Sequence, residues 1–187
     1  MRSIKCVTPP VREPVTLEEV KAWLKLETTD DDPVLLQLIG TARQMVEHYT
    51  SRALLAQTWR LVIAMPVALP FVVLPKAPTL KLLSAALQDD AGLETPLDLA
   101  GLWLDCDSDP QRLVMGASSL AGGTGRGRVR FDLVFGYGEE AASVPDALRQ
   151  AVLVMVAQAY EQRGATDTPS VYPALALLAP YCLRRVS

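Results

Sequence analysis

The chain has 187 residues, of which 50% are hydrophobic and 21% charged, and its formal net charge at pH 7 is −3. This balance is typical of a folded globular protein and excludes intrinsic disorder. The weakly acidic total gives no bulk positive field of the kind that marks tight nucleic-acid binding. No apolar run reaches the roughly 18–20 residues of a membrane span, and the N-terminal MRSIKCVTPPVREP is too polar and Pro-rich for a signal peptide.

The first part of the chain, to about residue 55, shows helical periodicity. Thr16 and Glu19 stand three residues apart at the start of TLEEVKAWLKL, which predicts a capping box. A longer helix is expected from about Pro33 to Arg52, because apolar residues recur there at a spacing of three and four. The residues of this stripe are Leu35, Leu38, Ile39, Ala42, Met45, Val46 and Tyr49.

Three adjacent carboxylates, Asp30, Asp31 and Asp32, stand at the start of that helix. A calcium loop would need further spaced ligands and a later glutamate, which the sequence lacks. We therefore expect one of the three to cap the helix, Pro33 to suit its first turn, and the charges to face the positive end of the helix dipole.

The middle of the chain, residues 58–137, is predicted to form about six short strands with tight turns. The clearest is RVRFDLVFGYG, in which Val129, Phe131, Leu133 and Phe135 share one face, and Arg128, Arg130 and Asp132 share the other. The remaining strands are expected in TWRLVIAM, FVVLPKAP, LKLLSAALQDDAG and the two halves of LWLDCDSDPQRLVMG. Many short strands favour a compact antiparallel sheet or a small barrel.

Helical periodicity returns after Pro145, and Gly164 is expected to end that helix. ALALLAPYCLRR then predicts a short helix or an extended tail interrupted by Pro180. The apolar face of the longer helix consists of Leu148, Val152, Met155 and Ala159. The predicted fold is therefore α+β: both ends of the chain, 14–57 and 139–187, form a helical bundle, and 58–138 is an inserted small antiparallel β domain.

The residues that usually carry catalysis or bind metals are sparse. The three cysteines are scattered, no CxxC pair exists, and His48 is the only histidine, so neither a zinc site nor a disulfide framework is expected. Asp105 and Asp107 flank Cys106, which would raise the pKa of its thiol. A hydrolase that uses His48 stays an alternative, although no GxSxG motif is present. No cofactor is expected.

The segment AGGTGRGRVRF contains Gly122, Gly123, Gly125 and Gly127 beside three arginines. A phosphate cradle draws its strength from a helix N-terminus, but these glycines precede a strand. A loop that is mobile outside an assembly is therefore favoured. The alternative is a small soluble protein that binds a nucleotide or nucleic acid through loop 121–130.

Several segments in order are similar to the tailed-phage head–tail connector (adaptor) proteins. The similarity covers about residues 14–164, with a weaker match in LALLAPY. It rests on VTLEE, the Asp-rich start of the second helix, TSRAL, QTWRL, LPKAP, FGYG, VPDALRQA and YEQRG. The form with a strand-rich insertion occurs in prophages and gene transfer agents.

The resemblance implies a structural protein and not an enzyme. Such adaptors form a ring, usually of twelve subunits, in the neck of a virion or phage-like particle assembled from proteins made in the bacterial host cytoplasm. The ring lies beneath the portal, extends the DNA channel and joins the head to tail components. Its implied partners are the portal protein, a tail-side connector or stopper, other copies of the chain, and double-stranded DNA that passes without specific binding.

Two groups of residues are candidates for contacts in such an assembly. The resemblance implies that the C-terminal segment docks into the portal through Leu177, Leu178, Tyr181, Arg184 and Arg185. The cluster of Arg126, Arg128 and Arg130 faces the DNA channel, a neighbouring subunit or solvent, which makes it a candidate ring seam or channel rim.

Overall fold

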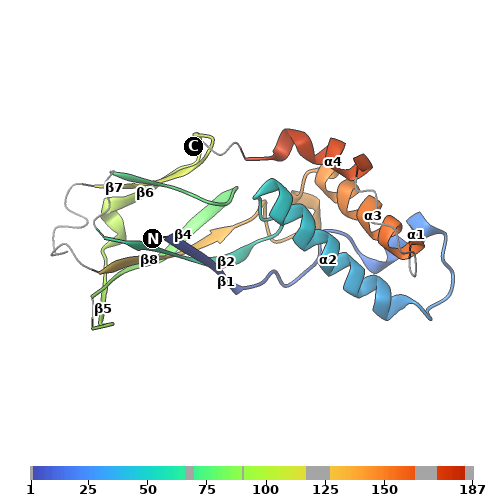
Figure 1. Cartoon of the computed structure of the whole chain (residues 1–187), viewed down its shortest axis with the longest axis horizontal. Coiled ribbons are helices and arrows are strands. Elements are labelled where there is room, and N and C mark those ends of the chain that lie inside the picture. Colours follow the sequence, from blue (N-terminus) through green and yellow to red (C-terminus); the bar gives the residue numbers. More distant parts are fainter. Residues whose placement is uncertain (1, 66–69, 90, 117–126, 163–171, 184–187) are drawn as a thin grey trace. The chain divides into compact units, whose positions relative to one another are not determined.

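The computed structural model has an α+β fold, and the structure describes residues 2–65, 70–89, 91–116, 127–162 and 172–183 (Figure 1). The chain divides into two compact units. The sheet unit comprises residues 1–9, 56–136 and 183–187, and the helical unit comprises Pro10–Leu55 and Tyr137–Cys182.

The sheet unit contains two antiparallel sheets, which Figure 1 shows as separate layers. The described strands are β1 Arg2–Thr8, β2 Gln57–Ala64, β3 Phe71–Val73, β4 Thr79–Gln88, β5 Glu94–Pro96, β6 Leu102–Asp105, β7 Arg112–Met115 and β8 Arg128–Phe135; η1 Leu99–Gly101 is a 3-10 turn. The five-stranded sheet has the order β1-β2-β8-β4-β5, and the three-stranded sheet has the order β3-β7-β6.

A hydrophobic core lies between the facing surfaces of these sheets. Phe131 and Leu133 of β8 and Leu61 of β2 are fully buried, as is Leu113 of β7. Leu61 stands directly opposite Phe131 in the β2–β8 register, so both side chains lie on the same face of the sheet. Burial of a side chain of this size contributes about 1.5–3 kcal/mol to the stability of the fold. Successive side chains of a strand point to opposite faces, so Arg128, Arg130 and Asp132 of β8 point to the other, open face.

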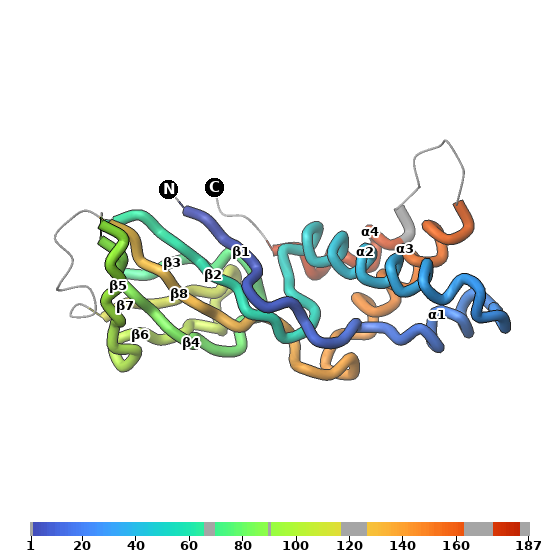
Figure 2. Tube along the Cα trace, turned by 90° about the horizontal axis from the view of Figure 1, so that it is seen from below, coloured from blue at the N-terminus to red at the C-terminus, as the bar shows by residue number. Residues whose placement is uncertain are grey.

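Two strands of the five-stranded sheet differ from the expectation. β1 lies in the polar, Pro-rich N-terminal segment and β5 at Glu94–Pro96, and no strand was predicted in either stretch. β1 pairs with β2, and Cys6 stands opposite Trp59. In Figure 2 the two strands run side by side although they are distant in the sequence. A polar edge strand whose partner lies far along the chain leaves little local signal.

The helical unit is built around α2 and α3, which lie side by side in Figures 1 and 2. Its described elements are α1 Leu17–Leu24, α2 Asp32–Thr50, η2 Ala141–Ser143, α3 Asp146–Glu161, α4 Tyr172–Leu178 and η3 Ala179–Tyr181. Leu35 and Ile39 of α2 pack with Leu148 and Val152 of α3 in one hydrophobic cluster. The predicted apolar stripes thus form the core of this unit, while Met45 and Tyr49 at their margin stay about half exposed.

The capping box at the start of α1 is confirmed. The Glu19 N–H donates to Thr16 Oγ1 at 3.2 Å, and the Thr16 N–H donates to Glu19 Oε2 at 2.8 Å. Arg149 of α3 also donates to Glu19 and, at 2.9 Å, to the carbonyl of Pro14. The cap therefore closes the first turn and attaches α1 to α3.

Of the roles expected at the start of α2, only the side-chain cap is wrong, because Pro33 and the acidic Asp32 do lie in the first turn. Asp31 is the N-cap residue, but its side chain makes no capping hydrogen bond. Asp31 instead accepts a hydrogen bond from the Tyr160 hydroxyl at 2.5 Å, and Asp32 pairs with Lys21 at 2.8 Å. These two carboxylates join the start of α2 to α3 and α1, because tertiary partners compete with the local cap for the same oxygens.

Candidate assembly surfaces

A network of charged side chains crosses the open face of the five-stranded sheet. Arg60 Nε and Nη2 donate to the two carboxylate oxygens of Asp132 at 2.8 and 3.1 Å. Ser84 donates to the same carboxylate at 3.1 Å. Arg130 Nη1 donates to Glu94 at 2.5 Å, and its Nε lies 3.8 Å from Asp132 Oδ2. Four strands, β2, β8, β4 and β5, therefore contribute to one network.

The pKa of Asp132 reflects two opposed effects. Partial burial favours the neutral acid, but hydrogen bonds from Arg60 and Ser84 and the positive charges of Arg60 and Arg130 outweigh it and lower the pKa. The Asp132 hydrogen bond in turn raises the pKa of Arg60. Both groups are consequently charged at neutral pH, and the bidentate geometry fixes the register of β2 against β8.

The predicted arginine cluster is split by this arrangement. Arg126 lies outside the described residues. Arg130 is held by Glu94 and Asp132 of the same chain, and its side chain is 22% exposed. Arg128 lies at the start of β8 on the same open face and is exposed. The structure thus separates an internally paired arginine from one that remains available to a partner.

The end of the glycine-rich loop is tightly constrained. Gly127 has a φ of +130°, and a Cβ atom at this position would lie 2.5 Å from the carbonyl oxygen of Gln88. Its own carbonyl accepts the Met65 N–H at 2.9 Å. The other glycines of AGGTGRGRVRF lie outside the described residues. β8 follows Gly127 directly, so the described part of this segment leads into a strand and not into the helix N-terminus that a phosphate cradle requires.

The described part of the predicted portal-docking segment belongs to the helical unit. Leu178 is fully buried in the hydrophobic core, and Leu177 and Tyr181 pack against it while partly exposed. The Tyr181 carbonyl accepts a hydrogen bond from Arg52 Nε at 2.6 Å. Arg184 and Arg185 lie outside the described residues. In this conformation Leu177 and Tyr181 present surface to a partner, whereas Leu178 holds the segment to the unit.

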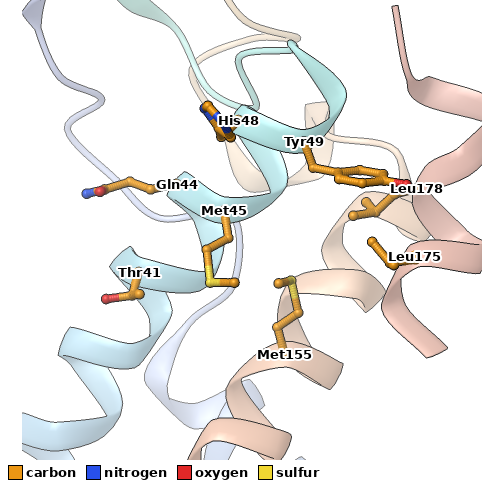
Figure 3. Close-up of a pocket in the computed structure, with 8 residues that line it drawn as sticks. All are labelled: Thr41, Gln44, Met45, His48, Tyr49, Met155, Leu175 and Leu178. Atoms are coloured by element: carbon orange, nitrogen blue, oxygen red, sulfur yellow. The ribbon is translucent and has the colours of Figure 1, made fainter. Parts of the chain in front are cut away.

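A mostly apolar pocket of about 370 Å³ lies between α2, α3 and α4 (Figure 3). Its lining residues are Thr41, Gln44, Met45, His48, Tyr49, Met155, Leu175 and Leu178. Figure 3 shows Met45 and Met155 pointing into the pocket and His48 at its edge. None of the eight lining residues is a carboxylate, serine or cysteine. The lining therefore gives His48 no orienting acid, and the Thr41 hydroxyl in it donates to the Gln37 carbonyl at 2.9 Å and not to His48.

Predictions from the sequence also concerned Cys106, groups of potential metal ligands and membrane-spanning helices. Cys106 has a raised pKa, caused first by burial and then by the charges of Asp107 and Asp105, which confirms the predicted direction. Within the described ranges, no three His, Cys, Asp or Glu side chains are grouped so that they could hold a metal ion. No helix in those ranges has the length and apolarity needed to cross a membrane.

Sequence reasoning missed the partners of the sheet network. The alternation along β8 placed Arg130 and Asp132 on the polar face, and the same alternation in β2 was available for Arg60. It could not show that Arg60 faces Asp132, 72 residues away, or that Glu94 faces Arg130. Pairing across strands depends on register, for which these short strands carry no local signal.

Known proteins resemble the chain both in sequence and in structure. Residues 14–95 match the family described as Phage gp6-like head-tail connector protein. A chain in the structure "Neck of empty GTA particle computed with C6 symmetry" is 28% identical, with a TM-score of 0.81 over 99% of this chain and 97% of that one. A chain in "Neck of native GTA particle computed with C12 symmetry" is also 28% identical, with a TM-score of 0.81 over 100% and 97%.

A third chain, from "Virion of native gene transfer agent (GTA) particle", is 26% identical, with a TM-score of 0.81 over 98% of this chain and 97% of that one. None of the curated proteins matches the chain in sequence. The sequence match begins at residue 14, while the structural similarity extends over essentially the whole length. The chain is therefore similar to phage head–tail connector proteins in sequence over residues 14–95, and to chains from gene transfer agent necks in structure over almost its whole length.

Proposed function

We propose that the protein is a structural adaptor in the neck of a phage-like particle, where it joins the head to tail components and performs no catalysis. The observation that carries this proposal is the similarity, over almost all of both chains, to chains from the necks of gene transfer agent particles. The charged network on the sheet and the apolar pocket beside His48 agree with it, because both are suited to contacts and neither assembles a catalytic group.

The adaptor would act as a ring of twelve copies beneath the portal and extend the DNA channel. The similar chain solved with C12 symmetry supports this stoichiometry. DNA would pass through the ring without specific binding, since a lining that neutralised many phosphates would release counterions and hold the duplex. The net charge of −3 is consistent with passage. Residues 14–57 and 139–187 would form the adaptor core, and 58–138 the inserted β-rich subdomain.

The C-terminal segment would dock into the portal through Leu177, Leu178, Tyr181, Arg184 and Arg185. The partly exposed Leu177 and Tyr181 support this role, whereas the buried Leu178 would take part only if the segment is released from the core. The opposite side of the ring would meet a tail-side connector or stopper. We expect the purified chain to be monomeric and to form the ring on the portal; a stable ring in sedimentation without portal would contradict this expectation.

Electron microscopy of particles from the source tests the proposed function. Density for this chain between portal and tail is the expected result. Absence of the chain from purified, DNA-filled particles would overturn the proposal.

Arg52→Ala, which removes the hydrogen bond to the Tyr181 carbonyl, tests the docking segment separately. The variant should fold and change the occupancy of the chain on isolated portal.

A further inference from the structure

The two units carry net charges of opposite sign. The sheet unit, residues 1–9, 56–136 and 183–187, contains 11 Lys and Arg residues and 8 Asp and Glu residues. The helical unit, residues 10–55 and 137–182, contains 7 Lys and Arg residues and 13 Asp and Glu residues. At neutral pH the sheet unit is therefore at +3 and the helical unit at −6, a difference that the overall charge of −3 conceals.

Five of the eight described cations of the sheet unit lie on the open face of the five-stranded sheet. Residues that stand opposite each other in an antiparallel pair project from the same face. Lys5 stands opposite Arg60, and Arg60 stands opposite Asp132. Lys81 stands opposite Val134, two positions along β8 from Asp132 and so on the same side. The cationic face comprises Lys5, Arg60, Lys81, Arg128 and Arg130.

Only part of this charge is neutralised within the chain. Asp132 and Glu94 are the carboxylates that pair with the face, and they hold Arg60 and Arg130. Lys5, Lys81 and Arg128 are exposed, and no ion pair between described residues includes any of the three. The face thus has a mixed-charge centre surrounded by cations that are available to a negatively charged partner.

The helical unit presents negative charge at the end where α2 starts and α3 ends. The hydrogen bond from Tyr160 to Asp31 brings these two helix ends together. Glu27 and Asp30 before α2 and Glu161 at the end of α3 are exposed there. Among the described residues, the nearby cations are Lys21, which is paired with Asp32, and Lys25 at the α1 C-cap. Described carboxylates therefore outnumber described cations at this acidic end.

We propose that, in the ring, the cationic face of one copy contacts the acidic end of the helical unit of the next copy. This inference rests on the proposed function, because a cyclic ring requires each subunit to join its neighbour through two different surfaces. Opposite charges on those surfaces specify direction and register. They also disfavour contact between two identical surfaces, which would create a two-fold dimer in place of a ring.

A second copy fits the cationic face better than DNA does. Asp132 and Glu94 lie among the cations, and in a complex with DNA they would lie against phosphates. A protein surface carries both signs and tolerates such a mixed centre. A duplex held by the three exposed cations, Lys5, Lys81 and Arg128, would also be retained by counterion release, which opposes its passage through a neck. Exposed charges are screened by salt, so assembly through this contact should weaken as the salt concentration rises.

The test uses two variants with complementary charge reversals. The sheet-reversed variant carries Lys5→Glu, Lys81→Glu and Arg128→Glu. The helix-reversed variant carries Glu27→Lys, Asp30→Lys and Glu161→Lys. All six positions are exposed, so both variants should fold, as circular dichroism and thermal unfolding would verify. Wild type and variants are each mixed with the portal protein, and rings are counted by negative-stain electron microscopy.

We expect each variant alone to form about tenfold fewer rings than wild type, because three contacts become repulsive. An equimolar mixture should form rings again when the two variants alternate around an even-numbered ring. The reversed, negative sheet face then meets the reversed, positive helix end, and the unaltered sheet face of the other variant meets an unaltered helix end, so every contact again joins opposite charges. Failure of the folded mixture to recover, or wild-type ring yield from either variant alone, would overturn the inference while the proposed function stands.

A charge-matched control separates this contact from net charge. Glu18→Lys, Glu139→Lys and Asp146→Lys alter the helical unit by the same charge as the helix-reversed variant but away from its acidic end. Asp146 and Glu161 bound α3 and are about 22 Å apart along it. The control should form rings like wild type, and an equal loss of rings would overturn the inference.

Ring formation by wild type on portal and binding of a DNA duplex provide two further tests. Absence of rings from wild type on portal would overturn both the ring and the inference that rests on it. Binding of a fluorescein-labelled 20-base-pair duplex by wild type at physiological salt, lost in the sheet-reversed variant while its rings persist, would assign the cationic face to nucleic acid and overturn the inference. We expect no such binding by either protein.

Discussion

The helical unit and the sheet unit differ in the range of the contacts that define their elements. The α1 cap joins Thr16 to Glu19, and the buried ion pair of α2 joins Arg43 to Glu47 four residues later. The first link in the five-stranded sheet, by contrast, joins β1 to β2 about 50 residues along the chain. Contacts over about 130 residues attach α3 to α1, but they join helices already favoured by their own sequences.

In a helix the backbone N–H and C=O groups find their hydrogen-bond partners within the same segment, whereas in a strand they need partners from another segment. The helical unit should therefore be most sensitive at the few buried polar groups inside its helices. The sheet unit should be most sensitive where strands meet. Four tests, from the largest expected effect to the smallest, probe this difference.

Arg43→Met should have the largest effect, in the helical unit. Arg43 Nε pairs with Glu13 at 2.7 Å and Nη1 with Glu47 at 3.0 Å, and the Arg43 and Glu47 side chains are at most 9% exposed. Without Arg43 the buried Glu47 carboxylate loses this ion pair, so the free energy of unfolding should fall by about 3–5 kcal/mol. Urea unfolding followed by circular dichroism measures this change.

Arg12→Met is the matched control for that substitution. Arg12 pairs with Glu140 at 2.5 Å, but both side chains are more than 60% exposed. Exposed pairs contribute at most about 1 kcal/mol. A loss for Arg12→Met as large as that for Arg43→Met would show that burial does not decide the cost.

Leu133→Ala and Leu148→Ala compare the two cores with identical chemistry. Leu133 belongs to the sheet unit and Leu148 to the helical unit, and both are fully buried. Each should lower the free energy of unfolding by about 2–5 kcal/mol. Fluorescence of Trp59 and Trp103 reports on the sheet unit and that of Trp23 on the helical unit. Each substitution should shift the transition of its own unit more, and equal shifts of both transitions would show a single cooperative unit.

Gly127→Ala tests the close approach between β8 and β4. The added Cβ would clash with the Gln88 carbonyl oxygen at 2.5 Å and hold alanine at a φ of +130°. We expect a loss of about 1–3 kcal/mol in thermal unfolding. Gly92→Ala is the control, because Gly92 also has a positive φ, +85°, but no atom lies within 4 Å of its Cβ position. A smaller loss at Gly127 than at Gly92 would contradict the clash.

Asp132→Asn should have the smallest effect and should depend on pH. The folded pKa of Asp132 lies below its unfolded value of about 3.9. Its stabilising contribution is therefore present above about pH 4 and is lost as the pH falls through the folded pKa. The substitution should cost about 1 kcal/mol at pH 7, since Arg60 is partly exposed, and should flatten the acid side of the stability profile. An unchanged slope below pH 4 would contradict this assignment.

The candidate assembly surfaces were predictable only in part. The pattern along α3 correctly indicated the burial of Leu148, Val152 and Met155, and the alternation along β8 that of its apolar face, because both periods follow from local backbone geometry. The arginine cluster was expected as one group, yet Arg130 is paired with Glu94, 36 residues earlier, while Arg128 stays exposed. Sequence spacing does not reveal which cation a distant carboxylate will neutralise.

By itself, the sequence determined the helices, most strands, the α+β class and the order of segments that resembles the connector proteins. These properties depend on periodicity, caps and turns, which act within a few residues. Tertiary structure alone decided the β1 pairing, the role of Asp31 and Asp32 as links between helices, and the gathering of cations on one sheet face. Each of these required a partner from another segment, and folding selects such partners through register and burial that no local pattern specifies.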